Sequence, residues 1–118
     1  MKSSDLQRLE HMKIYCEAIG KTIERFGRGA DILENDQDYS DSVSMKLSQI
    51  GELSVGLSDG FKLETKDLVQ WKLIRGLRNI TVHDYQSVNY SDIWRTITQD
   101  IPQLLKFCNE IIGQNQTL

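Results

Sequence analysis

An arginine, an asparagine, a histidine and a tyrosine stand within eight residues in the last third of this chain, from Arg78 to Tyr85. An imidazole titrates near neutral pH and suits general acid–base chemistry. A guanidinium can bind a phosphate through two parallel hydrogen bonds and stabilise the charge that builds on it. Arg78 and His83 therefore fit metal-independent RNA cleavage, in which a 2′-hydroxyl attacks the neighbouring phosphate. One histidine serves one of the two proton transfers, and a two-fold dimer could supply the other.

The spacing of these residues limits how they can meet. Asn79 and His83 are four apart, so they share one face if the helix continues. Arg78 and His83 are five apart, roughly 140° around a helix axis. Both can line one cleft only if the helix ends or bends near Val82, and the polar Asp84–Ser87 stretch favours such an ending.

The elements that must position this segment are predicted to be helices. The chain has 118 residues, which indicates one domain spanning 1–118, and its single proline and eight glycines favour helices over short strands. Apolar residues recur every three or four positions over 5–26, about 40–57, 65 to about 82 or 83, and 91–112. We predict an all-α, up-and-down bundle of four main helices, with room for a short fifth around 32–34.

Capping and breaking residues set the expected ends of these helices. We expect caps at Ser4 or Asp5, at Thr65 and at Ser91, and ends at Gly27–Ala30 and Ser58–Gly60. Pro102 lies within the last apolar pattern and predicts a kink. The inner face of the third helix is expected to carry Leu68, Trp71, Ile74 or Arg75, and Arg78.

Composition and charge exclude several classes of protein. A net charge of −3 argues against broad, charge-driven binding to nucleic acid or membrane, although it allows a local basic site. No apolar run reaches the roughly 18 residues of a membrane span, and the first residues lack a secretory signal. We expect a cytoplasmic protein without membrane contact, and no metal or cofactor.

The remaining reactive side chains have ordinary explanations. Cys16 and Cys108 fall on apolar stripes and are expected to be reduced core residues. His11 is expected at the surface, and Tyr39 is expected to be structural. The acidic residues Glu34, Asp36, Asp38 and Asp41 lack the order of a calcium-binding loop and predict a solvated loop.

The segment RNITVHDY, residues 78–85, matches the R-x4-H-x-Y motif of the HepT-like toxins in the HEPN superfamily of all-helical ribonucleases. The flanking segments resemble the same family over residues 5–112. SQIGELSVGL is similar to its Ile-Gly-Glu helix, WKLIRGLRNITVHDY to its W-x-x-I-x-G-L-R-N helix, and SDIWRTITQDIPQL to the helix that follows.

The resemblance implies a single HEPN-like domain that forms a homodimer, with the motifs of both subunits facing a shared cleft. Arg78 and His83 would be the catalytic pair, supported by Asn79 and Asp84. It also implies a type VII-like toxin–antitoxin pair, in which an MntA-like nucleotidyltransferase antitoxin transfers AMP from ATP to Tyr85. The adenylyl group would add bulk and negative charge where RNA phosphate should bind.

Other roles follow from position alone. Lys62, Lys66, Lys72 and Arg75 precede the motif and could form the positive wall of an RNA groove, or an ordinary solvated face. Glu52 follows the Ile-Gly pair and could anchor Arg78 or His83. An alternative function is a non-catalytic nucleotide- or protein-binding HEPN module. A further alternative makes the motif a polar cluster at a dimer interface, or pairs Arg78 with Glu52 or Asp84.

Overall fold

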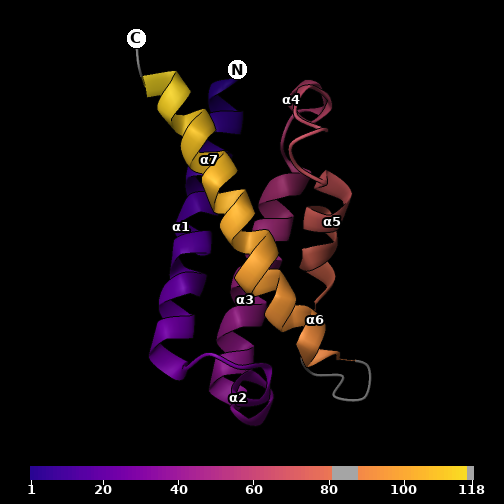
Figure 1. The fold of residues 1–118 in the computed structure, drawn as a ribbon. Helices are drawn as coiled ribbons and strands as arrows, with labels where there is room; N and C mark the ends of the chain where they lie inside the picture. The colour runs from indigo at the N-terminus through magenta and orange to yellow at the C-terminus, as the bar shows by residue number, and fades with distance from the viewer. Residues whose placement is uncertain (81–87, 117–118) are drawn as a thin grey trace.

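The computed structural model describes residues 1–80 and 88–116, and these residues are helical without any strand among them (Figure 1). The predicted all-α fold is therefore confirmed. The elements in chain order are α1 (Ser3–Phe26), α2 (Ala30–Asn35), α3 (Gln37–Val55), α4 (Asp59–Glu64), α5 (Trp71–Gly76), the 3₁₀ turn η1 (Leu77–Asn79), α6 (Tyr90–Arg95), the π-helical turn η2 (Thr96–Asp100) and α7 (Ile101–Gln116).

The three long helices form the body of the bundle. Helix α1 packs on α3 and on α7, and α5 with η1 packs on the opposite side of α3 from α1 (Figure 1). The core contains the predicted stripes of the long helices, including Leu9, Met12, Cys16, Ile19 and Ile23 from α1 and Val43, Leu47 and Ile50 from α3. No described helix is long and apolar enough to cross a membrane.

The start of α1 differs from the prediction. Lys2 occupies the N-cap position and no side chain caps the helix, so neither Ser4 nor Asp5 does so. The Asp5 carboxylate is instead buried and accepts hydrogen bonds from the backbone nitrogen of Ser58, at 2.8 Å, and from the Ser58 hydroxyl, at 2.6 Å. The helix ends where expected, since Gly27 follows it with φ 115°.

The predicted acidic loop is mostly helical, and the expected short helix is α2. Asp36 caps α3 by accepting hydrogen bonds from the backbone nitrogens of Asp38 and Tyr39, because a carboxylate satisfies amide groups that have no partner within the helix. Tyr39 is buried and structural, as predicted. Its hydroxyl donates to the Gly27 carbonyl at 3.0 Å, and its ring stacks on Phe26.

The segment between α3 and α5 contains the largest departure from the prediction. Ser58 was expected to end the second helix, but α3 already ends at Val55. Ser58 is instead the N-cap of α4, a helix that the apolar pattern did not predict. Thr65 ends α4 and does not begin the next helix, because its hydroxyl is buried between Phe61 and Trp71. It donates to the Phe61 carbonyl at 2.8 Å and accepts from the Trp71 indole nitrogen at 2.9 Å. Helix α5 consequently begins only at Trp71, and Leu68 is exposed.

The helix that carries the start of the motif is shorter than predicted. Helix α5 gives way to the turn η1 after Gly76, and Ile80 already has an extended backbone, with φ −71° and ψ 115°. The expected continuation to Val82 or His83 is therefore wrong at Ile80, and both of those residues lie outside the described ranges.

The last helical segment begins two residues earlier than expected, and a π-helical turn stands just before the proline at which a kink was predicted. Asn89, not Ser91, occupies the N-cap position and accepts a hydrogen bond from the Asp92 backbone nitrogen. The π-helical turn η2 directly precedes the segment that contains Pro102, and the Ile101 nitrogen bonds to the Thr96 carbonyl five residues back. The proline, which cannot donate a backbone hydrogen bond, thus follows a local change of helical pitch.

Candidate active site

The structure describes only the first part of the motif. Arg78 and Asn79 lie in η1, whereas His83, Asp84 and Tyr85 lie outside the described residues. The predicted meeting of Arg78 with His83, and of Asn79 with His83, therefore stays a prediction. The end of the helix before Ile80 meets the condition that the five-residue spacing imposed, since a continuous helix would place Arg78 and His83 on different faces.

The backbone of Arg78 is fixed by helix α3. A β-carbon added to Gly51 would lie 2.4 Å from the Arg78 nitrogen and 2.9 Å from its Cα, so only glycine allows this approach. One turn earlier on α3, the Ser48 hydroxyl donates a hydrogen bond of 3.4 Å to the Arg78 carbonyl. The neighbouring Leu77 is buried in the core. The first residue of the motif is thus held against α3 by a close backbone contact and a hydrogen bond, next to a residue anchored in the core.

Helix α5 is anchored at its other end by an aromatic cluster. The Trp71 ring meets the edge of Phe107 from α7, at 5.8 Å between centroids, and lies 6.1 Å from Phe61 of α4. The indole nitrogen finds its partner in buried Thr65, as a buried indole usually must. Trp71 and Ile74 face the core as predicted, so the opposite face of α5 is left to solvent.

The solvent face of α5 carries positive charge toward Arg78. Lys72 and Arg75 are exposed, and the Arg78 side chain is half-buried. Within the described ranges, ion pairs form only between Arg28 and Glu24 and between Arg95 and Asp92. The cations of α5 therefore form no ion pair with a carboxylate of the described residues, and they are available to bind an anionic group of another molecule.

The other predicted site residues lie in different surroundings. Glu52 is exposed on α3, next to Gly51, and it makes no ion pair with Arg78. Lys66 is exposed in the turn after α4 and lines a hollow between that turn, α5 and the start of α7. Lys62 is half-buried on α4, and His11 is exposed on α1 as expected.

The two thiols are core residues, as predicted. Cys16 is 3% exposed and Cys108 is fully buried. Burial raises the pKa of Cys16, and the nearby Cys108 and Glu17 raise it further. Burial also raises the pKa of Cys108 to about 12, against a smaller lowering effect of Lys13. Neither thiol is a nucleophile near neutral pH.

Two residues that position the site were missed from the sequence. Gly51 lies inside the Ile-Gly-Glu segment, and a glycine in the middle of a good helix pattern is a signal of close backbone approach. The hydrogen bond from Ser48 to the Arg78 carbonyl could not be predicted, because a serine at this position is ordinary on a helix. The sequence predicts a role for the neighbouring Glu52 instead, because its side chain is charged.

Comparison with known proteins places the chain among ribonucleases and proteins named as such. The family model described as "Ribonuclease HepT-like" matches residues 12–111. The chain is 34% identical over 108 residues to the protein named "Putative RNase TTE0752" from Caldanaerobacter subterraneus subsp. tengcongensis, covering 92% of this chain and 94% of that protein. It is 31% identical over 87 residues to "Putative RNase MJ1380" from Methanocaldococcus jannaschii, covering 64% and 79%.

No solved structure matches the chain. The matched range begins within α1 and ends within α7, and it contains Gly51 and the segment 78–85. The chain belongs to the HepT-like ribonuclease family.

Proposed function

We propose that this protein is the metal-independent endoribonuclease toxin of a type VII-like toxin–antitoxin pair, with Arg78 and His83 as its catalytic pair at a homodimer cleft. Family membership supports the ribonuclease activity. The held backbone of Arg78 is the structural observation that carries the proposal, because a catalytic cation stabilises a transition state only when its position is set in advance.

The reaction needs a base, an acid and a cation. The base takes the proton of a 2′-hydroxyl, the freed oxygen forms a bond to the adjacent phosphorus, and the bond from phosphorus to the 5′-oxygen breaks. The acid returns a proton to that 5′-oxygen, leaving a 2′,3′-cyclic phosphate and a 5′-hydroxyl. His83 of each subunit would take one proton-transfer role, while Arg78 neutralises charge on the phosphate. Asn79 and Asp84 would orient these two side chains.

The exposed cations of α5 support an RNA-binding role beside the catalytic pair. Lys72 and Arg75 precede Arg78 by six and three residues, so the three recur at about one helical turn. A row of cations at this spacing can contact successive phosphates of a single strand. The protein is acidic overall, so this row would provide local attraction within a repelling surface.

Tyr85 would be the control point. In the proposed regulation, an MntA-like antitoxin directs the Tyr85 hydroxyl to attack the α-phosphorus of ATP, which forms an AMP-tyrosine ester and releases pyrophosphate. The added phosphate would carry negative charge close to Arg78 in sequence, where it would compete with RNA for that cation. Glu52 is exposed one residue after Gly51 and would help to orient Arg78 or His83 only through a contact formed with RNA bound.

The test uses the chain alone and the chain produced together with its nucleotidyltransferase. The unmodified protein should cleave RNA in the presence of EDTA and leave cyclic phosphate ends, and the co-produced protein should carry AMP on Tyr85 and be inactive. His83→Ala and Arg78→Ala should each lower cleavage by at least about a hundredfold. Peptide mass spectrometry locates the AMP group.

The chain itself offers a matched control. It contains only two histidines, and His11 is exposed on α1, so His11→Ala should cleave RNA like the unchanged protein. A folded, dimeric His83→Ala protein with full cleavage would refute the catalytic assignment. Nucleotide or protein binding without any cleavage would instead favour a non-catalytic HEPN module.

A further inference from the structure

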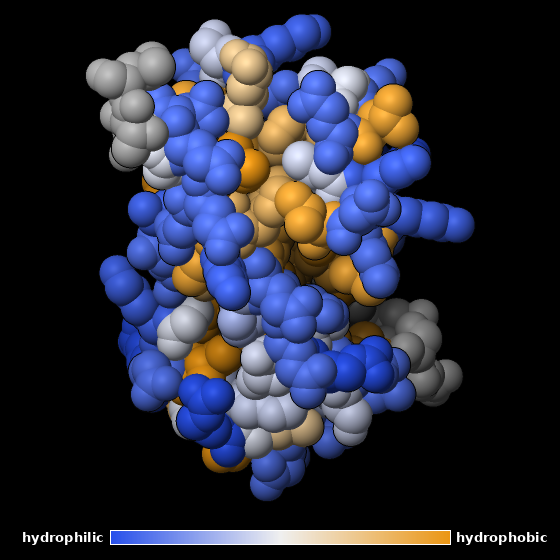
Figure 2. Space-filling view, turned by 45° about the horizontal axis from the view of Figure 1, so that its top comes forward, coloured by the Kyte–Doolittle hydropathy of each residue, from blue (hydrophilic) through white to orange (hydrophobic). Residues whose placement is uncertain are grey.

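A serine hydroxyl inside the bundle has no hydrogen-bond partner among the described residues. Ser44 of α3 is 7% exposed, and its Oγ atom is buried and unpaired. On the face shown in Figure 2, hydrophilic side chains cover most of the surface and hydrophobic ones gather in a depression. A polar group in the interior departs from this pattern. When it is also unpaired it destabilises the folded state, because it loses its contacts with water and gains none in return.

Ser44 is the middle member of a row of three serines on one side of α3. Ser40, Ser44 and Ser48 are four residues apart, so their side chains follow one another along the helix. The Ser40 hydroxyl donates to the Leu33 carbonyl of α2 at 2.7 Å, and the Ser48 hydroxyl donates to the Arg78 carbonyl of η1 at 3.4 Å. The two outer serines thus join α3 to the main chain of a neighbouring segment, whereas the middle one does not.

The chain that carries the start of the motif runs along this row toward Ser44. The Arg78 nitrogen lies against the position of Gly51, whereas the Arg78 carbonyl lies at Ser48, closer to the start of α3. Helix α5 and η1 therefore run antiparallel to α3, as Figure 1 also shows. In this direction the backbone that leaves Arg78 next reaches the level of Ser44.

The distances along α3 single out the carbonyl of Ile80. Ser44 and Ser48 are separated by four residues of α-helix, roughly 6 Å along the axis. Asn79 in the 3₁₀ turn advances the chain by about 2 Å and the extended Ile80 by about 3.3 Å. The Ile80 carbonyl consequently comes to the level of the Ser44 hydroxyl. The Ile80 side chain packs against the core, which keeps this stretch on the bundle.

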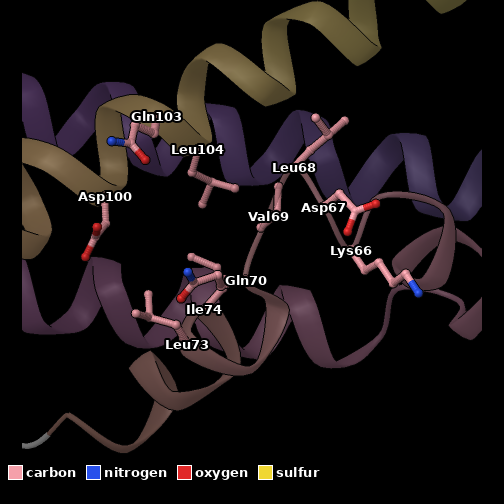
Figure 3. A pocket seen from close by; sticks show the side chains of 10 residues that line it. All are labelled: Lys66, Asp67, Leu68, Val69, Gln70, Leu73, Ile74, Asp100, Gln103 and Leu104. Carbon is pink, nitrogen blue, oxygen red and sulfur yellow. The ribbon is translucent and has the colours of Figure 1, made fainter.

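The other side of α5 is less able to fix the position of this stretch. A hollow of about 220 Å³ lies there, between α5, the turn before it and the start of α7, with Leu73 and Leu104 among its walls (Figure 3). Side chains that border an unfilled volume lack packing contacts on that side. The contacts that set the position of η1 along the bundle are therefore those made with α3.

We propose that Ser44 is a positioning residue of the RNA site, whose hydroxyl donates to the Ile80 carbonyl when RNA is bound at Arg78. This inference rests on the proposed function and extends the contacts of Gly51 and Ser48 by one turn of α3. The unpaired hydroxyl raises the free energy of the RNA-free protein, so the bond favours the RNA-bound arrangement. At Ser44, stability is given up for the geometry of a functional site.

Ser44→Ala tests the inference through two quantities that should change in opposite senses. Removal of the unpaired hydroxyl should raise the melting temperature of the RNA-free protein by roughly 3–10 °C. Removal of the bond should raise the dissociation constant for a single-stranded 2′-O-methyl RNA, which lacks the attacking hydroxyl, at least about fivefold. The value of kcat/KM for a cleavable RNA should fall by at least the same factor. A purely structural serine would lower stability and activity together.

Ser40→Ala is the matched control on the same row. Ser40 is also buried, but its hydroxyl is already paired with the Leu33 carbonyl. Its removal should lower the melting temperature by several degrees and leave RNA binding and kcat/KM unchanged. Circular dichroism confirms that both variants are folded.

The outcomes separate this inference from the proposed function. A lower melting temperature in Ser44→Ala would overturn the inference, because the hydroxyl would then be paired in the RNA-free protein. A higher melting temperature with unchanged RNA binding and cleavage would also overturn it. RNA binding that depends on Ser44 in a chain that cleaves nothing would count against the ribonuclease proposal alone. A chain that neither binds nor cleaves RNA would overturn both.

Discussion

Helix α3 touches the backbone of Arg78 through Gly51, so closely that a β-carbon at this glycine would lie 2.4 Å from the Arg78 nitrogen. The contact joins two segments that are 27 positions apart in sequence. It fixes where the motif leaves the bundle, and the Ser48 hydroxyl adds a hydrogen bond to the carbonyl of the same residue. Helix α3 therefore serves as the template on which Arg78, the first residue of the motif, is placed.

Gly51→Ala should separate α3 from η1. The new methyl group cannot fit against backbone atoms at this distance, so η1 must shift by about 1 Å or α3 must rotate. Overpacking of this kind costs about 1–3 kcal/mol of unfolding free energy. A displacement of that size at a catalytic group lowers turnover by about a hundredfold. Urea unfolding and cleavage of a labelled RNA would measure the two effects.

Gly20→Ala is the control for that experiment. Gly20 lies within α1 with nothing within 4 Å of an added β-carbon. The substitution should stabilise the protein by about 0.5–1 kcal/mol, because alanine favours the helix, and should leave cleavage unchanged. Equal loss of cleavage in the Gly51 and Gly20 variants would contradict the template role of α3.

Asp5 and Ser58 should depend on each other for stability. Asp5→Ala removes the acceptor of two short hydrogen bonds and leaves the Ser58 backbone nitrogen without that partner, which costs about 1–3 kcal/mol. Ser58→Ala also removes the cap of α4, worth about 1 kcal/mol. The double variant should lose less than the sum of the two, as measured by chemical denaturation in a double-mutant cycle.

Asp59→Ala provides the comparison for this cycle. Asp59 is an exposed acid in the first turn of α4, so it contributes only through the helix dipole, about 0.3–1 kcal/mol. Strictly additive losses for Asp5→Ala and Ser58→Ala would mean that the buried pair does not act as one unit.

The buried thiols predict a loss of stability in alkali. Both folded-state pKa values lie above the ordinary 9.0, with Cys108 at about 12, so the folded protein keeps protons that the unfolded chain releases. The unfolding free energy should therefore fall as pH rises above about 9. A Cys16→Ala/Cys108→Ala variant should show a smaller fall between about pH 7 and about pH 10.

Thiol chemistry checks the same point independently. Ellman's reagent reacts with thiolates, so neither cysteine should react in the native protein at neutral pH, and both should react in denaturant. Rapid labelling of the folded chain would show that these side chains are not in the core.

The regular parts of the fold were predictable because each has a single local cause. The apolar stripe of α1, the stripe of α3 and the stop at Gly27 depend on periodicity and on one left-handed glycine. The burial of both cysteines followed from their place on such stripes.

The errors arise where a polar side chain has a distant partner. Thr65 has the sequence preference of a cap, but its hydroxyl is needed by the Trp71 indole, and the helix start moves to Trp71. Asp5 has the sequence preference of a cap for α1, but its carboxylate accepts a hydrogen bond from the hydroxyl of Ser58, 53 residues away. The motif could be predicted from its residue types and spacing. The role of Gly51 could not, because it depends on the backbone of Arg78 packing against α3 at this glycine.

The exposed cations of α5 should control how strongly RNA binds and have little effect on the chemical step. Lys72→Ala and Arg75→Ala each remove one cation from the row that precedes Arg78. Each should raise KM severalfold with a small change in kcat, because phosphate contacts made equally in ground and transition states act on binding. The slope of log affinity against log salt should become shallower by about 0.7 for each lost contact to a single strand.

Arg95→Ala separates this effect from a general loss of positive charge. Arg95 is also exposed, but it pairs with Asp92 at 3.4 Å on α6, so its charge is already compensated. The variant lowers the net charge by the same amount as Arg75→Ala and should leave the salt slope unchanged. Fluorescence anisotropy with a labelled single-stranded RNA, repeated over a range of salt concentrations, measures all three slopes. Equal slopes for Arg75→Ala and Arg95→Ala would show that RNA senses only the overall charge, and the row on α5 would then be a solvated helix face.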